Sequence, residues 1–484
     1  MSIFIRNLAK GAKWTAIEKI LNQLSKFLVI VILARLLTPE DFGLVAIVLF
    51  FVLIAESFIS AGFTHAYINA DDKGESEERL FSNLIFLNFI VGVIASLILI
   101  CLSSTISQFY GDERIGLVVT VLAFLLIFDS ISYAIKAKLE KKLQFDVITK
   151  INIPVFIISS LFAVLYAWSY EDYWALVIQQ IIYKIFILFF YIKKNSNSKF
   201  EVNHINKEQI TYLYHYGWKL QLATTLNTTS KEMNTLLIAS SSGVGTAGIY
   251  SRANNLQVLI IQTIVNVIEK VTFPLLSELN RKSGSLIPYF RKSNKIFALL
   301  IYPILAIVFI NSDSIIKIIF GSGWIQVSDL LKILIISGGF RFLQSSNLTF
   351  LKVIGRTDLI LKLRITECIS VITFLFVGLN WGIKGLVLAQ TLSTICNWLI
   401  VAKITSIYST YTIYQQASDV SKYLISALVA FVLVMALIED FDLYFIFEFI
   451  LSTIIYISLY LICLVIFKVP EIKYIYQYIK AKFK

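Results

Sequence analysis

The chain has 484 residues, of which 57% are hydrophobic and 15% are charged, with a mean hydropathy of +0.77. Soluble domains usually contain about 25% charged residues, so this composition excludes a soluble globular protein and indicates a polytopic membrane protein. The formal net charge is +12. Because the Lys and Arg residues gather in loops between apolar runs, we expect them to face anionic lipid, and we expect no nucleic-acid partner.

Apolar runs of about 20 residues predict an all-α fold with about fourteen transmembrane helices. No linker is long enough for a separate soluble domain, so nearly all the chain is expected in or at the bilayer. The basic start of the chain lacks a small-residue cleavage site, so we expect the first helix to be retained. The predicted helices are 14–36, 42–68, 80–103, 115–138, 149–168, 173–192, 211–240, 245–274, 292–311, 327–350, 358–379, 384–405, 420–438 and 443–467.

The basic residues also predict the orientation of the chain. Lys and Arg are frequent at one set of helix ends, whereas the other set has little beyond Arg35, Arg114, Lys317 and Lys384. The basic side is expected to be cytoplasmic, which puts both termini inside and makes the number of spans even. The acidic loop 69–79 falls on the same side by parity; acidic residues contribute little to this rule.

An internal repeat relates the two halves of the chain. Asn22, Lys26, Ala34 and Gly43 recur as Asn227, Lys231, Ala239 and Gly248 at a constant offset of 205 residues. Each half would hold six helices, so the halves are expected to be parallel repeats of a transporter with a central path. We therefore predict an N-terminal six-helix lobe at 1–200, a C-terminal six-helix lobe at 201–410, and two additional helices with a basic cytoplasmic tail at 411–484.

Polar side chains form a stripe on the first predicted helix and another on the seventh. A charged residue at the centre of a bilayer costs about 2.5 to 3.5 kcal/mol on insertion scales, so such stripes require a hydrated cavity or polar partners. Both alternatives stay open, although the recurrence in both halves favours a cavity. The stripes comprise Thr15, Glu18, Lys19, Asn22 and Lys26 on the first helix, and Thr224, Asn227, Thr228, Lys231, Asn234 and Thr235 on the seventh.

Further ionisable residues fall inside predicted spans: Glu56, Asp129, Lys184, Lys219, Glu232, Arg252, Lys332, Arg341 and Glu367. The candidate cavity groups are more basic than acidic, which indicates an anionic substrate such as a phosphate or pyrophosphate. For each residue, a structural ion pair is the alternative. The substrate-binding candidates are Lys19, Asn22, Lys26, Asn227, Lys231, Arg252 and Arg341. The candidates for ion coupling are Glu18, Glu56 and Glu232.

Other motifs argue against an enzyme. Residues 243–248 read GxGxxG, but no βαβ pattern surrounds them, and we interpret them as a short turn between helices seven and eight. The segment 38–41, by contrast, should start a helix with Thr38 as N-cap and Pro39 at its first position. The sequence has no HExxH, GxSxG or Walker A motif, and the four cysteines and three histidines are scattered. We therefore expect no metal, no cofactor and no catalysis, and an ion or substrate gradient as the energy source.

The segment "ARLLTPEDFGLVAIVLFFVLIAESFISAGFTHAYIN" (34–69) resembles the Wzx-type polysaccharide and O-antigen flippases of the MATE-like MOP exporter superfamily. Supporting matches are "ISQFYGDERI" (106–115), "KLEKKLQFDVI" (138–148), "GVGTAGIYSRANNL" (243–256) and "VTFPLLSEL" (271–279). The resemblance covers most of the chain.

This resemblance implies two six-helix lobes around a cationic cavity in the bacterial inner membrane. The implied activity is transfer of undecaprenyl-pyrophosphate-linked oligosaccharide units from the cytoplasmic to the outer leaflet, for O-antigen, capsule or exopolysaccharide. The two extra helices would help to hold the lipid tail. Membrane lipids, a polysaccharide polymerase and a chain-length regulator are the implied partners.

Three rival functions stay open. A MATE-type cation-coupled drug antiporter should have an acidic cavity, which the basic excess argues against. A lipid II flippase would differ only in its cargo. A membrane glycosyltransferase or polysaccharide polymerase should carry a large extramembrane loop, and the loops here are short.

Overall fold

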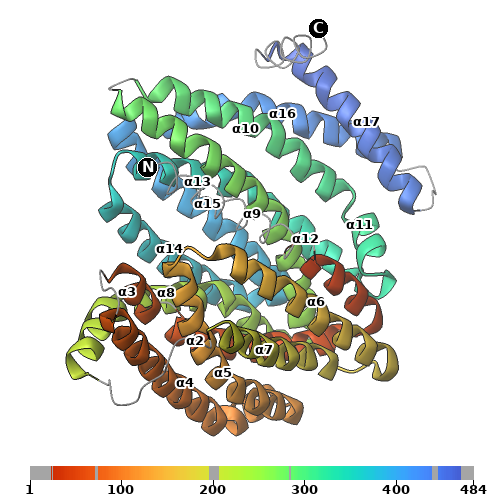
Figure 1. The fold of residues 1–484 in the computed structure, drawn as a ribbon. Coiled ribbons are helices and arrows are strands. Elements are labelled where there is room, and N and C mark those ends of the chain that lie inside the picture. The colour runs from red at the N-terminus through yellow and green to blue at the C-terminus, as the bar shows by residue number, and fades with distance from the viewer. Residues whose placement is uncertain are drawn as a thin grey trace. The chain divides into compact units, whose positions relative to one another are not determined.

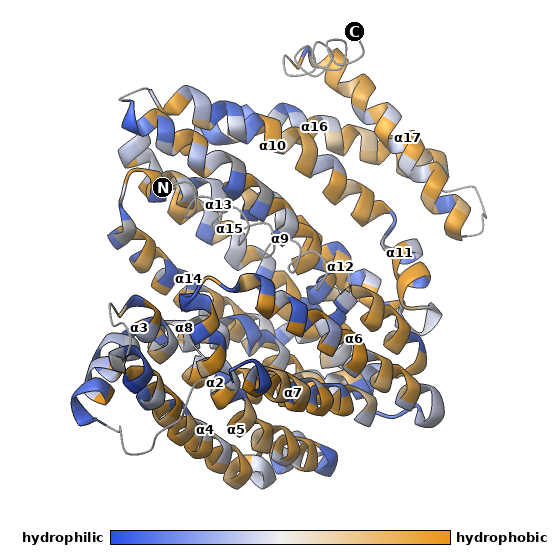
Figure 2. Ribbon diagram, in the orientation of Figure 1, coloured by the Kyte–Doolittle hydropathy of each residue, from blue (hydrophilic) through white to orange (hydrophobic). Residues whose placement is uncertain are grey.

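The structure is a computed structural model that describes residues 23, 25–60, 62–70, 75–195, 206–282, 285–438 and 445–469. Helix accounts for 93% of these residues, and they include no strand, which confirms the all-α class. Ten of the described helical segments are long and apolar enough to cross a membrane (Figure 2). The protein is therefore a multi-pass membrane protein, while the exact count of fourteen spans stays a prediction.

The chain divides into two compact units, residues 1–248 and 249–484. In the first unit α2 packs against α4, α5, α7 and α8, and short turns join α4 to α5 and α6 to α7 as neighbouring pairs. Residues 25–36 form a helix before α2. The other helices of this unit are α2 (Pro39–Ser60), α3 (Gly62–Asn69), α4 (Glu75–Tyr110), α5 (Glu113–Lys141), α6 (Phe145–Tyr170), α7 (Trp174–Lys194) and α8 (Lys207–Ser242) (Figure 1).

The start of α2 follows the local chemistry predicted for it. The backbone N–H of Thr38 donates to Asp41 Oδ2 at 2.9 Å, and the Asp41 N–H donates back to Thr38 Oγ1 at 3.3 Å. These bonds satisfy donors that have no partner within the helix, and Pro39 is the first helical residue. The predicted helix start is confirmed.

A core of buried side chains joins α3, α4, α5 and α7 in this unit. Tyr67, Phe81, Ile135 and Tyr191 are at most 3% exposed. Because lipid tails are as apolar as these side chains, close packing rather than removal from water stabilises the cluster, which gives the unit its own core.

In the second unit α10 packs against α13 and α16, α13 against α15, α14 against α15, and α16 against α17. Gly378 and Gly385 lie so close that the backbones of α14 and α15 nearly touch beside their connecting turn. The elements are α9 (Val244–Arg281), of which the first five residues belong to the first unit, α10 (Ile287–Ile310), α11 (Ser312–Ile319), η2 (Ser322–Trp324), α12 (Gln326–Ile336), α13 (Gly338–Val353), α14 (Thr357–Gly378), η3 (Leu379–Trp381), α15 (Gly382–Ser409), α16 (Ile413–Ile438) and α17 (Phe445–Ile466).

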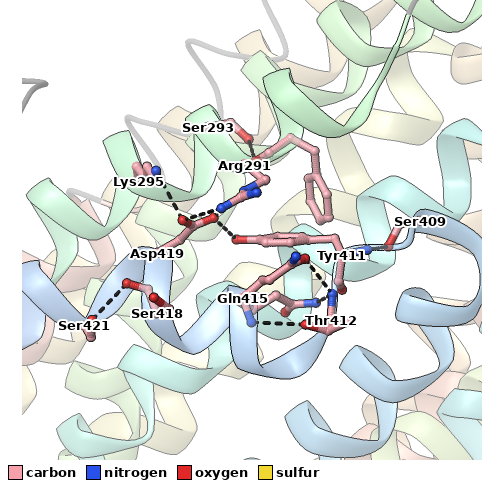
Figure 3. A network of polar contacts seen from close by, with 12 residues as sticks. Arg291, Ser293, Lys295, Ser409, Tyr411, Thr412, Gln415, Ser418, Asp419 and Ser421 are labelled. Carbon is pink, nitrogen blue, oxygen red and sulfur yellow. Dashed lines mark hydrogen bonds and ion pairs between the residues drawn. The ribbon is translucent and has the colours of Figure 1, made fainter.

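A polar network fastens α16 to α10 (Figure 3). Arg291 donates through Nε and Nη2 to the two oxygens of Asp419, at 2.7 and 2.9 Å. Lys295 Nζ lies 3.2 Å from the same carboxylate, and the Tyr411 hydroxyl donates to it at 2.9 Å. The two helices that follow the predicted repeat are thus attached through α10, to which Tyr460 of α17 also donates a bond, at Leu299 O.

From the second predicted helix onward, each predicted range overlaps a helix of the structure. The prediction of one helix over 327–350 is wrong: α12 ends at Ile336, and α13 begins at Gly338. The adjacent Gly338 and Gly339 are poor helix formers, which accounts for the break. The sequence also missed the short α11. The predicted six-helix lobes stay a prediction.

Candidate functional site

Residues that are equivalent in the sequence repeat pack on one another in the first unit. A Cβ on Gly43 would lie 1.9 Å from the Val244 carbonyl oxygen, and a Cβ on Gly248 would lie 1.9 Å from the Pro39 carbonyl oxygen. Pro39 and Val244, like Gly43 and Gly248, are separated by the repeat offset of 205 residues. The starts of α2 and α9 therefore cross reciprocally, with backbone against backbone. We call this contact the glycine crossing.

The GxGxxG motif at 243–248 forms the turn between α8 and α9 and the first turns of α9. Gly243 has φ +91° and separates α8 from α9, which begins at the next residue. Gly245 and Gly248 lie inside the first turns of α9. The motif is a tight turn between two helices, as predicted, and no strand precedes it.

Several predicted site residues fall outside what the structure describes. Glu18, Lys19 and Asn22 lie outside the described residues, and Asn227 lies in α8 with its side chain also outside them. The described candidates are Lys26, Glu56, Lys231, Glu232, Arg252 and Arg341.

The repeat partners Lys26 and Lys231 are both exposed and stand at equivalent places on their helices. Both side chains are exposed, whereas Ala34 and Ala239, eight residues further along each helix, are 2% and 5% exposed. Each lysine therefore projects from a helix that buries a small residue at the equivalent place. Such exposed ammonium groups can contact an anionic ligand.

Arg252 and Arg341 lie in the second unit on α9 and α13, and both are half-buried. The Arg252 guanidinium lies beside Ser251, 3.3 Å from its hydroxyl. Arg341 makes no hydrogen bond or ion pair with any side chain that the structure describes. Ser337, one turn earlier, accepts a bond from Gln257 of α9 at 2.9 Å. A half-buried guanidinium in such a place is costly without an anion nearby.

Polar side chains near Arg341 on α13 are largely occupied by contacts inside the unit. Ser345 donates to Glu269 of α9 at 3.1 Å, and Gln344 is only 5% exposed. Ser345 thereby joins α13 to α9. Arg341 itself is half-buried and remains available to a ligand among the described side chains.

A cluster of three ionisable side chains that was not predicted from the sequence lies in the first unit. Lys184 of α7 donates to Glu56 of α2 at 2.5 Å and also to Asp129 of α5. The three side chains are 7%, 17% and 13% exposed, in that order. Sequence reasoning named Glu56 as a coupling candidate and noted the other two only as ionisable residues within spans. We call this cluster the buried triad.

Most other described ion pairs balance one acid with one base. Lys138 pairs with Glu78 at 2.7 Å, and Lys332 pairs with Asp313 at 2.8 Å. Burial would raise the pKa of the Asp313 carboxyl, but the hydrogen bond from Lys332 and its positive charge help to outweigh burial and hold that pKa below its usual value. For Lys332, therefore, the structural alternative holds. Within the described ranges, no group of three or more His, Cys, Asp or Glu side chains is placed to hold a metal.

Known proteins with similar sequences act in the biosynthesis of polysaccharides, by their names. Residues 32–329, more than half of the chain, match the family model described as "Polysaccharide biosynthesis protein". The chain is 26% identical to the teichuronic acid biosynthesis protein TuaB of Bacillus subtilis (strain 168), over 74% of each chain. It is 21% identical to the lipopolysaccharide biosynthesis protein WzxC of Escherichia coli (strain K12), over 81% of this chain and 80% of that one.

Solved structures show which fold this is. The lipid II flippase MurJ, in an inward closed conformation, matches with a TM-score of 0.71 at 16% identity, over 95% of this chain and 98% of the other. An inward-facing multidrug resistance MATE transporter of the MOP superfamily matches with a TM-score of 0.62 at 14% identity, over 80% and 94% of the two chains. The resemblance inferred from the sequence motifs is confirmed, and the chain belongs to the polysaccharide biosynthesis protein family, with the fold of the MOP transporters.

Proposed function

We propose that the protein is a flippase that carries polyprenyl-pyrophosphate-linked oligosaccharide units from the cytoplasmic to the outer leaflet of the bacterial inner membrane. The observation that carries the proposal is the combination of two findings: membership in a polysaccharide biosynthesis family, and a fold shared with a lipid II flippase along 95% of the chain. The family indicates the sugar, and the fold indicates movement across a bilayer.

The chemistry of the described residues is consistent with an anionic headgroup. Lys26 and Lys231 are exposed on helices, and Arg341 is half-buried without a partner among the described side chains. We propose that these cations, with Arg252 and the undescribed Lys19, hold the pyrophosphate, because ammonium and guanidinium groups both bind phosphate oxygens. Asn22 and Asn227 would meet sugar hydroxyls.

The topology of the proposed flippase follows from the loops. We propose that both termini lie in the cytoplasm, that the two lobes are residues 1–200 and 201–410, and that residues 411–484 supply two additional helices. A polymerase and a chain-length regulator of surface polysaccharide would act downstream of the same cargo. The protein itself would catalyse no bond change.

Leaflet-resolved detection of lipid-linked oligosaccharide tests the proposal, in cells with the gene deleted and then restored. The expected result is accumulation in the cytoplasmic leaflet that disappears on restoration, together with loss and return of surface polysaccharide.

The rivals predict different results. A MATE-type antiporter predicts no accumulation and altered sensitivity to cationic drugs. A lipid II flippase predicts accumulation of the peptidoglycan precursor and failure of growth. Either result would contradict the proposed cargo.

A further inference from the structure

The buried triad carries a charge imbalance. If both carboxyl groups were ionised, two negative charges would face the single positive charge of Lys184 inside a unit of membrane helices. Removing an uncompensated ion from water costs several kcal/mol even after the protein relaxes. The cluster therefore needs one further positive charge when it is closed to water.

Among the residues that the structure describes, the neighbours of the triad do not supply that charge. The ionisable neighbours on α5 and α7 are phenols, which are neutral near pH 7. The polar groups brought to the adjoining residues by α8, α4 and α6 are uncharged hydroxyls and amides. These neighbours are Tyr133, Tyr183 and Tyr191, together with Thr225, which bonds Ser57, Asn88, which bonds the Ser130 carbonyl, and Asn152, which bonds Tyr191.

The geometry selects a proton over a metal ion. The Lys184 ammonium already lies between the two carboxyl groups, at the position where an alkali cation would bind both. The Glu56 and Asp129 carboxyl groups contact the same ammonium group and therefore lie close to each other. Two carboxyl groups at such a separation share a proton, because like charges so close together cannot both ionise.

We propose that Glu56 and Asp129 bind one exchangeable proton beside the Lys184 ammonium, and that this proton is the ion coupled to transport. The proton comes from water on one side of the membrane and leaves to water on the other, with no other chemical change. The coupling half of this inference rests on the proposed flippase function, whereas the binding half stands on the geometry of the triad alone.

A physical link connects the triad to the helix that carries Lys231. Ser57, next to Glu56, shares a hydrogen bond of 2.7 Å with Thr225 of α8, and Gln221 of α8 donates to the Phe58 carbonyl. The turn of α2 that carries the proton site is therefore bonded directly to α8. If the proton were lost, the two negatively charged carboxylates would repel each other, and this repulsion would strain the hydrogen bonds between α2 and α8.

The binding half is tested by infrared spectroscopy of the full-length protein in lipid, as wild-type minus variant difference spectra at pH 7. We expect a protonated carboxyl band that disappears in Glu56→Gln and in Asp129→Asn, since the one carboxylate left pairs with Lys184 in ionised form. In the double variant Glu56→Gln/Lys184→Met the band should return, because the remaining carboxyl has lost its cation.

Glu78→Gln is the matched control, because Glu78 forms an ion pair with Lys138 in the same unit and lies outside the triad. This variant should leave the band intact. A wild-type protein without the band, or a band that sodium ions remove at constant pH, would overturn the proton site. Because the amide substitutions preserve side-chain shape, the variants remain informative even where the Met variant fails to fold.

The coupling half is tested in proteoliposomes that contain the protein, lipid extracted from the deletion strain and an internal pH-sensitive dye. Wild-type protein should move protons as labelled lipid-linked oligosaccharide changes leaflet, and Asp129→Asn should abolish the proton movement. Flipping with no proton movement in the wild type would overturn the coupling. An intact band in a protein that flips no lipid would instead overturn the proposed function and leave the proton site standing.

Discussion

Substitution of Gly43 by Ala tests the glycine crossing most directly. The new Cβ would lie 1.9 Å from the Val244 carbonyl oxygen, whereas ordinary contact begins at 3.4 Å, so the two helix starts must separate by about 1.5 Å. The obstacle is backbone, which cannot rotate away as a side chain can. We expect a loss at the upper end of the range for overpacking, about 3 kcal/mol, or roughly a hundredfold in the folding equilibrium.

The loss of stability is measured by thermal unfolding of the purified protein in detergent. The amount of protein in the membrane is a second measure. Gly248→Ala should cost a similar amount because its Cβ meets the Pro39 carbonyl at the same distance. The double variant should cost less than the sum, since the first substitution has already separated the helices. Gly323→Ala, where a Cβ meets nothing within 4 Å, is the control. An unfolding midpoint for Gly43→Ala equal to that control would refute the reasoning.

Three further predictions concern charged residues. Lys26→Ala and Lys231→Ala should each lower export of surface polysaccharide without lowering the amount of protein in the membrane; full export by the double variant would remove both from the substrate site. Asp419→Asn should cost about 1 to 3 kcal/mol by leaving two partly exposed cations without a charged partner, and an unchanged unfolding midpoint would contradict this. The Arg114 side chain donates to Asp112 and holds the pKa of that carboxyl below its usual value. The resulting stability is present above the unfolded pKa of about 3.9 and is lost as the pH falls through the lowered folded value. Arg114→Gln should flatten this acid dependence in unfolding midpoints measured from about pH 5 downward, and identical profiles would argue against it.

The elements could be predicted from the sequence because their signals are local. Apolar runs and turn residues placed a helix in every range from 42–68 onward, and the Thr38 cap was visible in four consecutive residues. Where the prediction of one helix over 327–350 was wrong, the cause was also local, since Gly338 and Gly339 follow Ser337 directly. Helix length and helix ends depend mostly on neighbouring residues, which a sequence displays.

The buried triad could not be predicted in this way. Its residues are 128 and 55 positions apart and lie on three helices that are apolar nearly all round. Such helices have no polar face that tells which side meets a partner, so only packing brings Lys184 to Glu56 and Asp129. The glycine crossing could be predicted only in part. The repeat shows that Gly43 and Gly248 are equivalent, but it does not show that they are in contact.

The network of Figure 3 also bears on the order in which the chain is made. Arg291 precedes Asp419 by 128 residues, which at about 5 to 20 residues per second takes about 6 to 26 s to synthesise. Until then the cations of α10 have no access to the carboxylate that binds them in the finished protein, and water or lipid phosphate must hold them at the membrane surface. Insertion of α16 is therefore the event that locks α10 in place, and a ribosome that stalls before Asp419 would leave α10 without this anchor.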